Sequence, residues 1–295
     1  MIHESILQYR GARYIWWALG LVGASVLLYL TQGGRHEPSG DTWQGYLLGT
    51  LGAVLIVWLA WLGIRKRQYA STLGTVQGWT SAHVMLGLAV VVVATLHCAG
   101  QFGFNVHTLA YALLCLVVLS GMLGLYLYLS TPRQLAANSG GQPRAALFAE
   151  LYELDRKGRE LCRRCDAEVN VAVRSSIERT AMGGGVYRQL FAVDDSRLQI
   201  PDAATGGSTV RRNADQAVVI DFVGQRVPRA AKRAEAADLQ ALVVVLCRRQ
   251  AILRRIRRDI RLQSWLSVWL FIHVPMTIAL LGALSAHILS TYLYW

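Results

Sequence analysis

Four histidines in two apolar stretches have the residue type and the spacing for metal coordination. His83 and His97 lie 14 residues apart, and the same separation recurs between His273 and His287 near the end of the chain. In an α-helix, 14 residues rise about 21 Å and turn about 1400°, about 40° short of four full turns. Both histidines of a pair therefore leave the same face of one helix. Because imidazole nitrogen is a common metal ligand, the pattern predicts two ligand positions on each of two helices.

The helices that carry these histidines are expected to cross a membrane. The chain has 295 residues, of which 54% are hydrophobic and 16% charged, a composition too apolar for an ordinary soluble domain. Five apolar stretches are near or above the roughly 20 residues that cross a bilayer. They cover residues 14–30, 43–64, 79–99, 108–129 and 264–293. The first could instead be the core of a cleaved signal peptide, which its two tryptophans and the lack of a small-residue cleavage site disfavour.

Basic residues predict the orientation of the spans. Two arginines precede the first span, and residues 65–67 between the second and third spans are all basic, whereas residues 31–42 and 100–107 carry one arginine between them. We therefore expect a multi-pass protein of a bacterial-type inner membrane, with its N-terminus cytoplasmic and its C-terminus periplasmic. This bias accounts for most of the net charge of +12, and no motif indicates nucleic-acid binding.

The predicted fold class is an all-α membrane protein, a bundle of five transmembrane helices with a cytoplasmic helical-hairpin insertion. Residues 1–130 would hold the first four helices, residues 131–263 the insertion, and residues 264–295 the fifth helix. Glycines such as Gly45 and Gly49 indicate close helix packing in preference to contact with a cofactor.

Periodicity gives a coarse prediction for the insertion. The fourth membrane helix is expected to stop at Pro132, and one amphipathic helix is predicted over residues 145–180. A Gly- and Ser-rich loop follows, with short strands around residues 187–193 and 217–223. After Pro228 a helix is expected to run without interruption into the fifth span, so that two long helices form a hairpin that caps the bundle.

The topology pairs the histidines at two depths. Both helices would run from the cytoplasm outward, so His83 and His273 share the inner level and His97 and His287 the outer level. Two facing imidazoles in a dry bundle suit a flat macrocycle whose central iron takes one nitrogen from each side, and haem is the simplest candidate. Structural histidines and a zinc site, which wants four ligands, are the weaker alternatives. The residues that would flank the ring are Gly87, Ala94, Leu280 and Ala283.

This pattern of His-x13-His on two membrane helices resembles the di-haem cytochrome b proteins, the membrane subunits of respiratory complexes. Transmembrane ferric reductases and NADPH oxidases have a similar pattern with slightly different second spacings. The resemblance covers the third and fifth spans. It implies two haems b, with His83 and His273 as ligands of the inner iron and His97 and His287 as ligands of the outer iron.

The function that the resemblance implies is electron transport across the bilayer, between quinone or quinol and the other subunits of a membrane redox complex. The chain would then be a subunit of an oxidoreductase complex. A self-contained ferric or oxygen reductase is an alternative, disfavoured because no G-x-G-x-x-G motif or nucleotide domain is visible. A quinol–cytochrome c reductase is disfavoured because no Pro-Glu-Trp-Tyr run is present. A non-redox membrane scaffold is the alternative from another class.

Other candidate residues carry weaker signals. His107, at the outer end of the fourth span, could contact a haem propionate or a quinone, or could be an interfacial cap. His3 and His36 are predicted to be ordinary surface residues. Cys162-x-x-Cys165 is interpreted as small helix residues in preference to a metal or redox site, because four thiolates or other ligands are usual there.

Seven arginines precede the fifth span. They favour contact with anionic lipid head groups at the cytoplasmic face over docking of an acidic partner, and some could meet haem propionates. They are Arg248, Arg249, Arg254, Arg255, Arg257, Arg258 and Arg261.

Overall fold

The structure, a computed structural model, describes residues 8–32, 39–68, 72, 74–201 and 207–293. Among these residues, five helices are long and apolar enough to cross a membrane, as the sequence predicts. The chain divides into two compact units. We call Met1–Tyr126 with Val268–Trp295 the histidine unit, and Leu127–Ser267 the polar unit.

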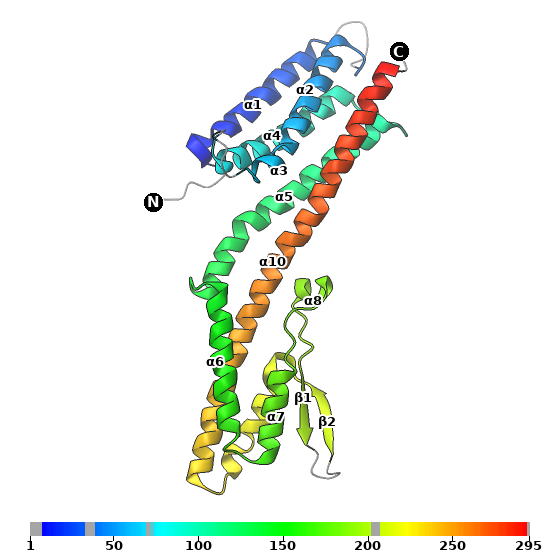
Figure 1. The fold of residues 1–295 in the computed structure, drawn as a ribbon. Helices are drawn as coiled ribbons and strands as arrows, with labels where there is room; N and C mark the ends of the chain where they lie inside the picture. The colour runs from blue at the N-terminus through cyan, green and yellow to red at the C-terminus, as the bar shows by residue number, and fades with distance from the viewer. Residues whose placement is uncertain (1–7, 33–38, 69–71, 73, 202–206, 294–295) are drawn as a thin grey trace. The chain divides into compact units, whose positions relative to one another are not determined.

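The histidine unit consists of helices (Figure 1). They are α1 (Tyr9–Leu30), α2 (Trp43–Ala60), α3 (Leu62–Arg65), α4 (Val76–Cys98), the first part of α5 (Val106–Ser139) and the last part of α10 (Arg233–Leu293). Helix α4 packs against both α1 and α2. The buried core of the unit takes side chains from α2, α4, α5 and α10: Ile56, Leu59, Val90, Leu114 and Leu280. These four helices are also the ones that carry or surround the histidines.

Two similar caps start α2 and α4. The Thr42 and Thr75 side chains accept hydrogen bonds from the backbone N–H groups of Gly45 and Gly78, each three residues further on. Threonine is a favoured N-cap because its oxygen satisfies a backbone donor that the first turn leaves unpaired. These caps fix where each helix begins, and so fix the level of every side chain on it.

Helix α5 does not stop at Pro132, and that prediction is wrong. It continues to Ser139 with the proline inside the helix. An internal proline removes one backbone hydrogen bond, but packing on both sides holds the helix here. Thr131 is only 1% exposed, and the Asn138 side chain donates to the Arg255 carbonyl at 2.8 Å.

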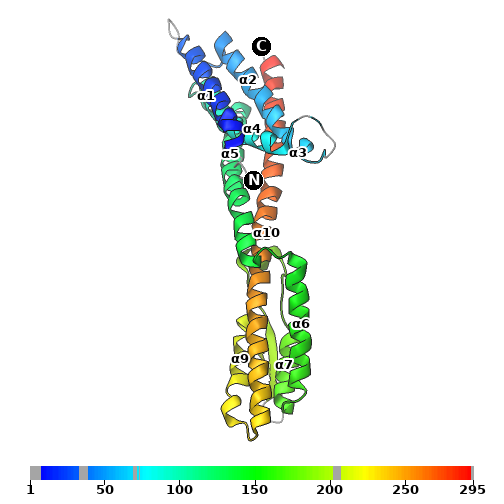
Figure 2. The same ribbon diagram turned by 90° about the vertical axis from the view of Figure 1, so that its left-hand side faces the viewer.

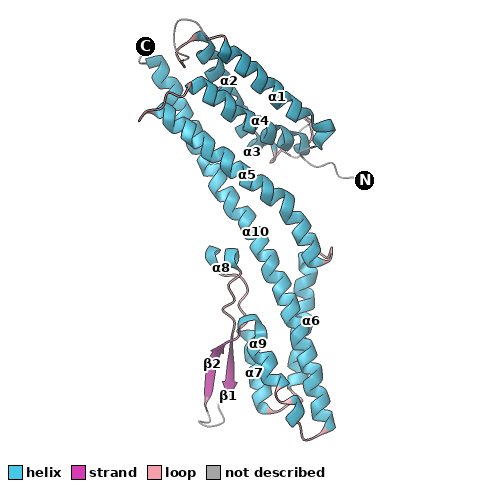
Figure 3. Ribbon diagram, turned by 180° about the vertical axis from the view of Figure 1, so that it is seen from behind, coloured by secondary structure: helices cyan, strands magenta, loops and turns pink. Residues whose placement is uncertain are grey.

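The polar unit contains the remaining elements. They are the second part of α5, α6 (Arg144–Cys162), α7 (Ala167–Glu178), α8 (Val186–Phe191), β1 (Arg197–Pro201), β2 (Ser208–Arg212), α9 (Ala217–Gly224) and the first part of α10. Strands β1 and β2 form an antiparallel pair, with Gln199 opposite Val210 (Figure 3). Helix α7 lies beside α6 (Figure 2) and also contacts β1.

Three details of the predicted insertion are wrong, and one is confirmed. The expected helix over residues 145–180 breaks between α6 and α7, because Asp166 accepts from the Val169 N–H and caps a new helix. Residues 187–193 and 217–223 are largely helical rather than extended. In α9 the β-favouring valines Val219 and Val223 lie four residues apart, and burial of that helical face overrides local propensity. The long helix into the fifth span is confirmed as α10.

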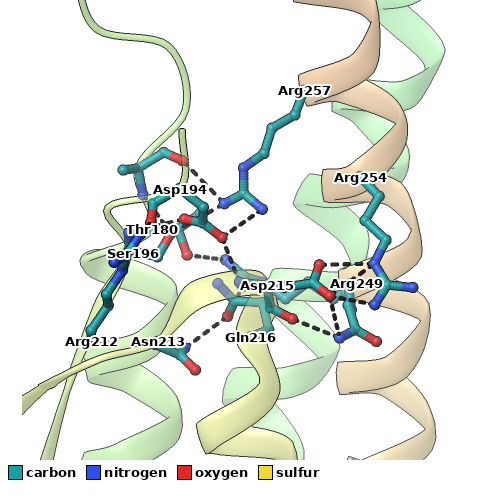
Figure 4. Close-up of polar contacts among 12 residues, drawn as sticks. Thr180, Asp194, Ser196, Arg212, Asn213, Asp215, Gln216, Arg249, Arg254 and Arg257 are labelled. Carbon is teal, nitrogen blue, oxygen red and sulfur yellow. Dashed lines mark hydrogen bonds and ion pairs between the residues drawn. The ribbon is translucent and has the colours of Figure 1, made fainter. Parts of the chain in front are cut away.

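Arginine side chains of α10 form hydrogen bonds and ion pairs with other segments of the polar unit (Figure 4). Arg249, 1% exposed, donates to Asp155 at 2.5 Å, Gln216 at 2.7 Å and Thr180 at 2.9 Å. A buried guanidinium has to be paired in this way, because an unpaired buried charge is costly.

Two more arginines of the same run pair within this unit. Arg257 pairs with Asp194 at 2.8 Å and donates to Ser196 at 3.1 Å, and Arg254 pairs with Asp215. The network therefore connects α10 to the segments on either side of the β-hairpin. The other arginines before the fifth span are exposed: Arg248, Arg255, Arg258 and Arg261.

Candidate functional site

Three imidazoles converge at one end of the histidine unit. The ring centroids of His97 and His287 lie 6.2 Å apart, and His107 lies 5.3 Å from His97 and 4.8 Å from His287. One ring nitrogen of each lies within 4.8 Å of the others, and this is the one such group of potential metal ligands among the residues the structure describes. The structure thus brings His97 and His287 together, and adds His107 from the start of α5.

The hydrogen bond of His97 fixes which of its nitrogens can bind a metal. Its Nδ1 lies 2.8 Å from the backbone carbonyl oxygen of Gly45. Because a carbonyl only accepts, Nδ1 carries the proton, and the lone pair is on Nε2. This arrangement, with the second nitrogen held by a carbonyl, is the usual one for a metal-ligating histidine.

His83 repeats the arrangement one level away. Its Nδ1 lies 3.0 Å from the carbonyl oxygen of Leu59. Gly45 and Leu59 are 14 residues apart on α2, as His83 and His97 are on α4. Two helices of opposite direction therefore match in register, and both imidazoles of α4 offer Nε2 as the free nitrogen.

His273 is held by α5 and by its own helix. The Ser120 hydroxyl lies 3.0 Å from His273 Nδ1. The indole of Trp269 stacks on the imidazole with 5.4 Å between ring centroids, and its N–H donates to the Ser120 carbonyl at 2.8 Å. The Ser120 hydroxyl and the Trp269 indole thus set the orientation of the His273 ring.

Glycines allow the helices to approach these rings. A Cβ atom added at Gly49 would lie 2.7 Å from His97 Cε1, and one at Gly45 would lie 2.5 Å from the Gly40 carbonyl oxygen. A Cβ at Gly124 would overlap the indole of Trp269, whereas one at Gly121 would lie 3.7 Å from His273. The glycines of α2 are therefore close-packing residues, and what Gly49 packs against is an imidazole ring.

A large cavity borders the three-histidine group. Its volume is about 1080 Å³, just above the usual range for small-molecule and cofactor sites. Apart from the histidines, its wall is mostly apolar and includes Leu48, Gly49, Ala94, Leu114, Leu280 and Leu284. A smaller cavity of about 680 Å³ adjoins the same histidines and is lined by the turn after α4, with Asp41 and Asn105. The three imidazoles thus border both the large apolar cavity and the smaller, more polar one.

Several of these groups carry no signal in the sequence. The carbonyls of Gly45 and Leu59 could not be identified, because every residue has one. Ser120 and Gly124 suggest only tight packing of α5. From the sequence, His107 is a weak candidate because the outer end of the fourth span suits an interfacial cap equally well, and its place beside His287 depends on how α5 packs.

The remaining candidates have no role in this site. Cys162 is buried in the core of the polar unit, and its thiol and that of Cys165 lie near backbone carbonyls of α6. Burial raises the pKa of Cys165 to about 11, so the thiol stays protonated and is a poor metal ligand. His3 and His36 lie outside the described residues.

Comparisons with known families, with characterised proteins and with solved structures find no match for this chain. The chemistry of the side chains therefore has to carry the functional conclusion.

Proposed function

We propose that this chain is a di-haem b-type cytochrome, a membrane subunit that transfers electrons across the bilayer between quinone or quinol and redox partner subunits. The observation that carries the proposal is the matched pair of hydrogen bonds from α4 to α2. His83 and His97 both have Nδ1 at a backbone carbonyl, so both present Nε2, the nitrogen that an axial ligand uses. A pair of histidines kept only for packing would need no common tautomer and no common spacing.

The residues at the outer level fit a haem. The cavity of about 1080 Å³ lies beside His97 and His287, and its mostly apolar wall suits a porphyrin. Ala94, three residues before His97 on α4, lines this cavity together with Leu280 of α10. An apolar pocket and axial ligands from side chains are what a b-type haem requires from a protein.

The proposed roles follow from these positions. His97 and His287 would hold the outer haem iron, and His83 and His273 the inner one. A haem iron with two imidazole ligands supplies one-electron redox chemistry. The chain supplies the ligand orientation, through the Gly45 and Leu59 carbonyls and the Ser120 hydroxyl, and an apolar surrounding that excludes water.

His107 would act at the edge of the outer site. It adjoins the smaller cavity of about 680 Å³, whose wall also includes Asn105 and Gln101. A propionate or a quinone carbonyl would find hydrogen-bond donors there. The exposed arginines before the fifth span would contact anionic lipids at the cytoplasmic face of the inner membrane, which is the orientation that the positive-inside rule gives.

Haem content tests the proposal directly. The full chain, purified in detergent from haem-sufficient cells, is expected to contain two haems b per chain by the pyridine haemochrome assay. His97→Ala and His287→Ala should each remove the same spectral species, and His83→Ala and His273→Ala the other. Purified protein without haem absorbance would contradict the proposal and favour a non-redox scaffold, and variants that lose neither species would disprove the pairing.

A second candidate function is supported by the convergence of three imidazoles. His97, His107 and His287 could bind a single transition-metal ion such as zinc or copper, since three histidines with one open position are a known catalytic arrangement. The two candidates differ in what they require of His107. A mononuclear site would lose its metal in His107→Ala, whereas the cytochrome would keep both haems in that variant.

A further inference from the structure

An exposed aromatic patch lies on the polar unit where α8 meets α10. It consists of Val186, Tyr187, Phe191 and Trp265, with exposed fractions of 61%, 70%, 58% and 38%. The rings of Tyr187 and Phe191 lie 4.8 Å apart, and those of Phe191 and Trp265 6.5 Å apart. The three rings thus form one continuous apolar surface rather than scattered exposed residues.

Helix α8 is amphipathic in spite of its six residues. Val186, Tyr187, Leu190 and Phe191 are apolar and four residues apart in pairs, which puts them on one side. Arg188 and Gln189 occupy the other side, and Arg188 pairs with Asp195 at 3.1 Å. The helix therefore turns an apolar face outward although its polar face has partners within the unit.

The aromatic patch lies at a defined position along α10. The Ser264 hydroxyl donates to the Gln189 side chain at 3.0 Å, which fixes α8 beside the start of the apolar stretch. Arg261 is the last charged residue of the chain, and residues 264–293 contain none. The patch is therefore at the level where α10 changes from charged to apolar.

We propose that α8 and Trp265 form an interfacial membrane anchor, whose aromatic patch lies in the head-group region of the bilayer. The inference rests on the proposed crossing of the membrane by α10. Tyrosine and tryptophan prefer this region, because their rings are apolar and their polar groups stay hydrated. The exposed Arg258 and Arg261 precede the patch on α10 and supply positive charge for lipid phosphates. Six residues are too few to cross the bilayer, so the apolar face of α8 would lie in the membrane surface.

Spin labels test the anchor in the full chain. In a Cys247→Ser background, which removes the exposed native cysteine, a nitroxide is attached at Phe191→Cys and, separately, at Tyr187→Cys. The matched control is Tyr152→Cys on α6, an aromatic residue that is 68% exposed in the same unit. The protein is reconstituted in vesicles of phosphatidylcholine with a minority of phosphatidylglycerol. Relaxation by oxygen, which concentrates in lipid, is compared with relaxation by a water-soluble nickel chelate.

Labels at positions 187 and 191 are expected to be accessible to oxygen and protected from the chelate, by several-fold relative to the label at position 152. Equal accessibility to the chelate at all three positions would overturn the proposal. Protection from both agents would also overturn it, because it would mean that protein covers the patch. Since the readout does not depend on haem, failure of the anchor and failure of the cytochrome proposal remain distinguishable.

Discussion

Gly49→Ala is expected to weaken haem binding selectively at the proposed outer site. The added methyl carbon would lie 2.7 Å from Cε1, 2.9 Å from Nδ1 and 3.1 Å from Nε2 of His97. Carbon atoms in contact normally lie about 3.5 to 4.0 Å apart, so the ring has to move by about 0.8 Å or more. All three nearest atoms belong to one edge of the imidazole, the edge that carries both nitrogens.

The size of the effect follows from the hydrogen bond that the ring would lose. His97 Nδ1 lies 2.8 Å from the Gly45 carbonyl oxygen, and a shift of about 0.8 Å along that direction exceeds hydrogen-bond distance. Loss of such an orienting partner typically costs about 10- to 100-fold in metal affinity. Alanine itself favours a helix over glycine by about 1 kcal/mol, which offsets part of the cost of the added contact.

The assay is a haem titration of the purified apoprotein, followed by the absorbance of each haem species. Gly49→Ala should bind the inner haem as the unaltered chain does and the outer haem about 10- to 100-fold more weakly. Gly23→Ala on α1 is the control, because a Cβ there would meet nothing within 4 Å. Unchanged affinity for both haems in Gly49→Ala would refute the assignment of His97 as a ligand in the orientation described.

Three other perturbations have expected outcomes. Gly124→Ala should lower the haem content of the proposed inner site, because the methyl group would overlap the Trp269 indole, which stacks on the proposed ligand His273. Gly121→Ala should not, because its Cβ would lie at an ordinary contact distance of 3.7 Å from the His273 ring. Equal haem content in both variants would contradict this. Arg249→Met should lower the free energy of unfolding in detergent by about 2 to 4 kcal/mol, somewhat below a fully buried pair because its carboxylate partner is partly exposed. Arg248→Met, at an exposed position, should change the free energy of unfolding by less than about 0.5 kcal/mol. Similar losses in the two arginine variants would contradict a stabilising role for the hydrogen bonds of Arg249. The pKa of Asp215 is lowered, mainly by a hydrogen bond from Arg254. The ionised carboxylate therefore stabilises the fold fully above the unfolded pKa of about 3.9, and this stabilisation is lost as the pH falls through the folded pKa. Asp215→Asn should therefore flatten the decline of Tm with acidity, and an unchanged decline would exclude this contribution.

The sequence alone determined the features that depend on local composition. The five apolar helices, α10 among them, follow from the length of each apolar stretch and from its content of helix-favouring residues, which are properties of the stretch itself. The common face of His83 and His97 follows from the helical repeat, and so does that of His273 and His287. Local signals failed where packing opposed them, as at Pro132, which stays inside α5, and in α9, where valines bury one helical side.

The groups that orient the histidines were decided only by the tertiary structure. The backbone carbonyls of Gly45 and Leu59 cannot be recognised from residue type. They lie opposite His97 and His83 only because α2 and α4 pack antiparallel in one particular register. His107 reaches its neighbours because α5 starts at the level where α4 and α10 bring His97 and His287 together. A residue type and a spacing can indicate a ligand, but the tautomer that leaves Nε2 free depends on a hydrogen bond to a backbone carbonyl of another helix.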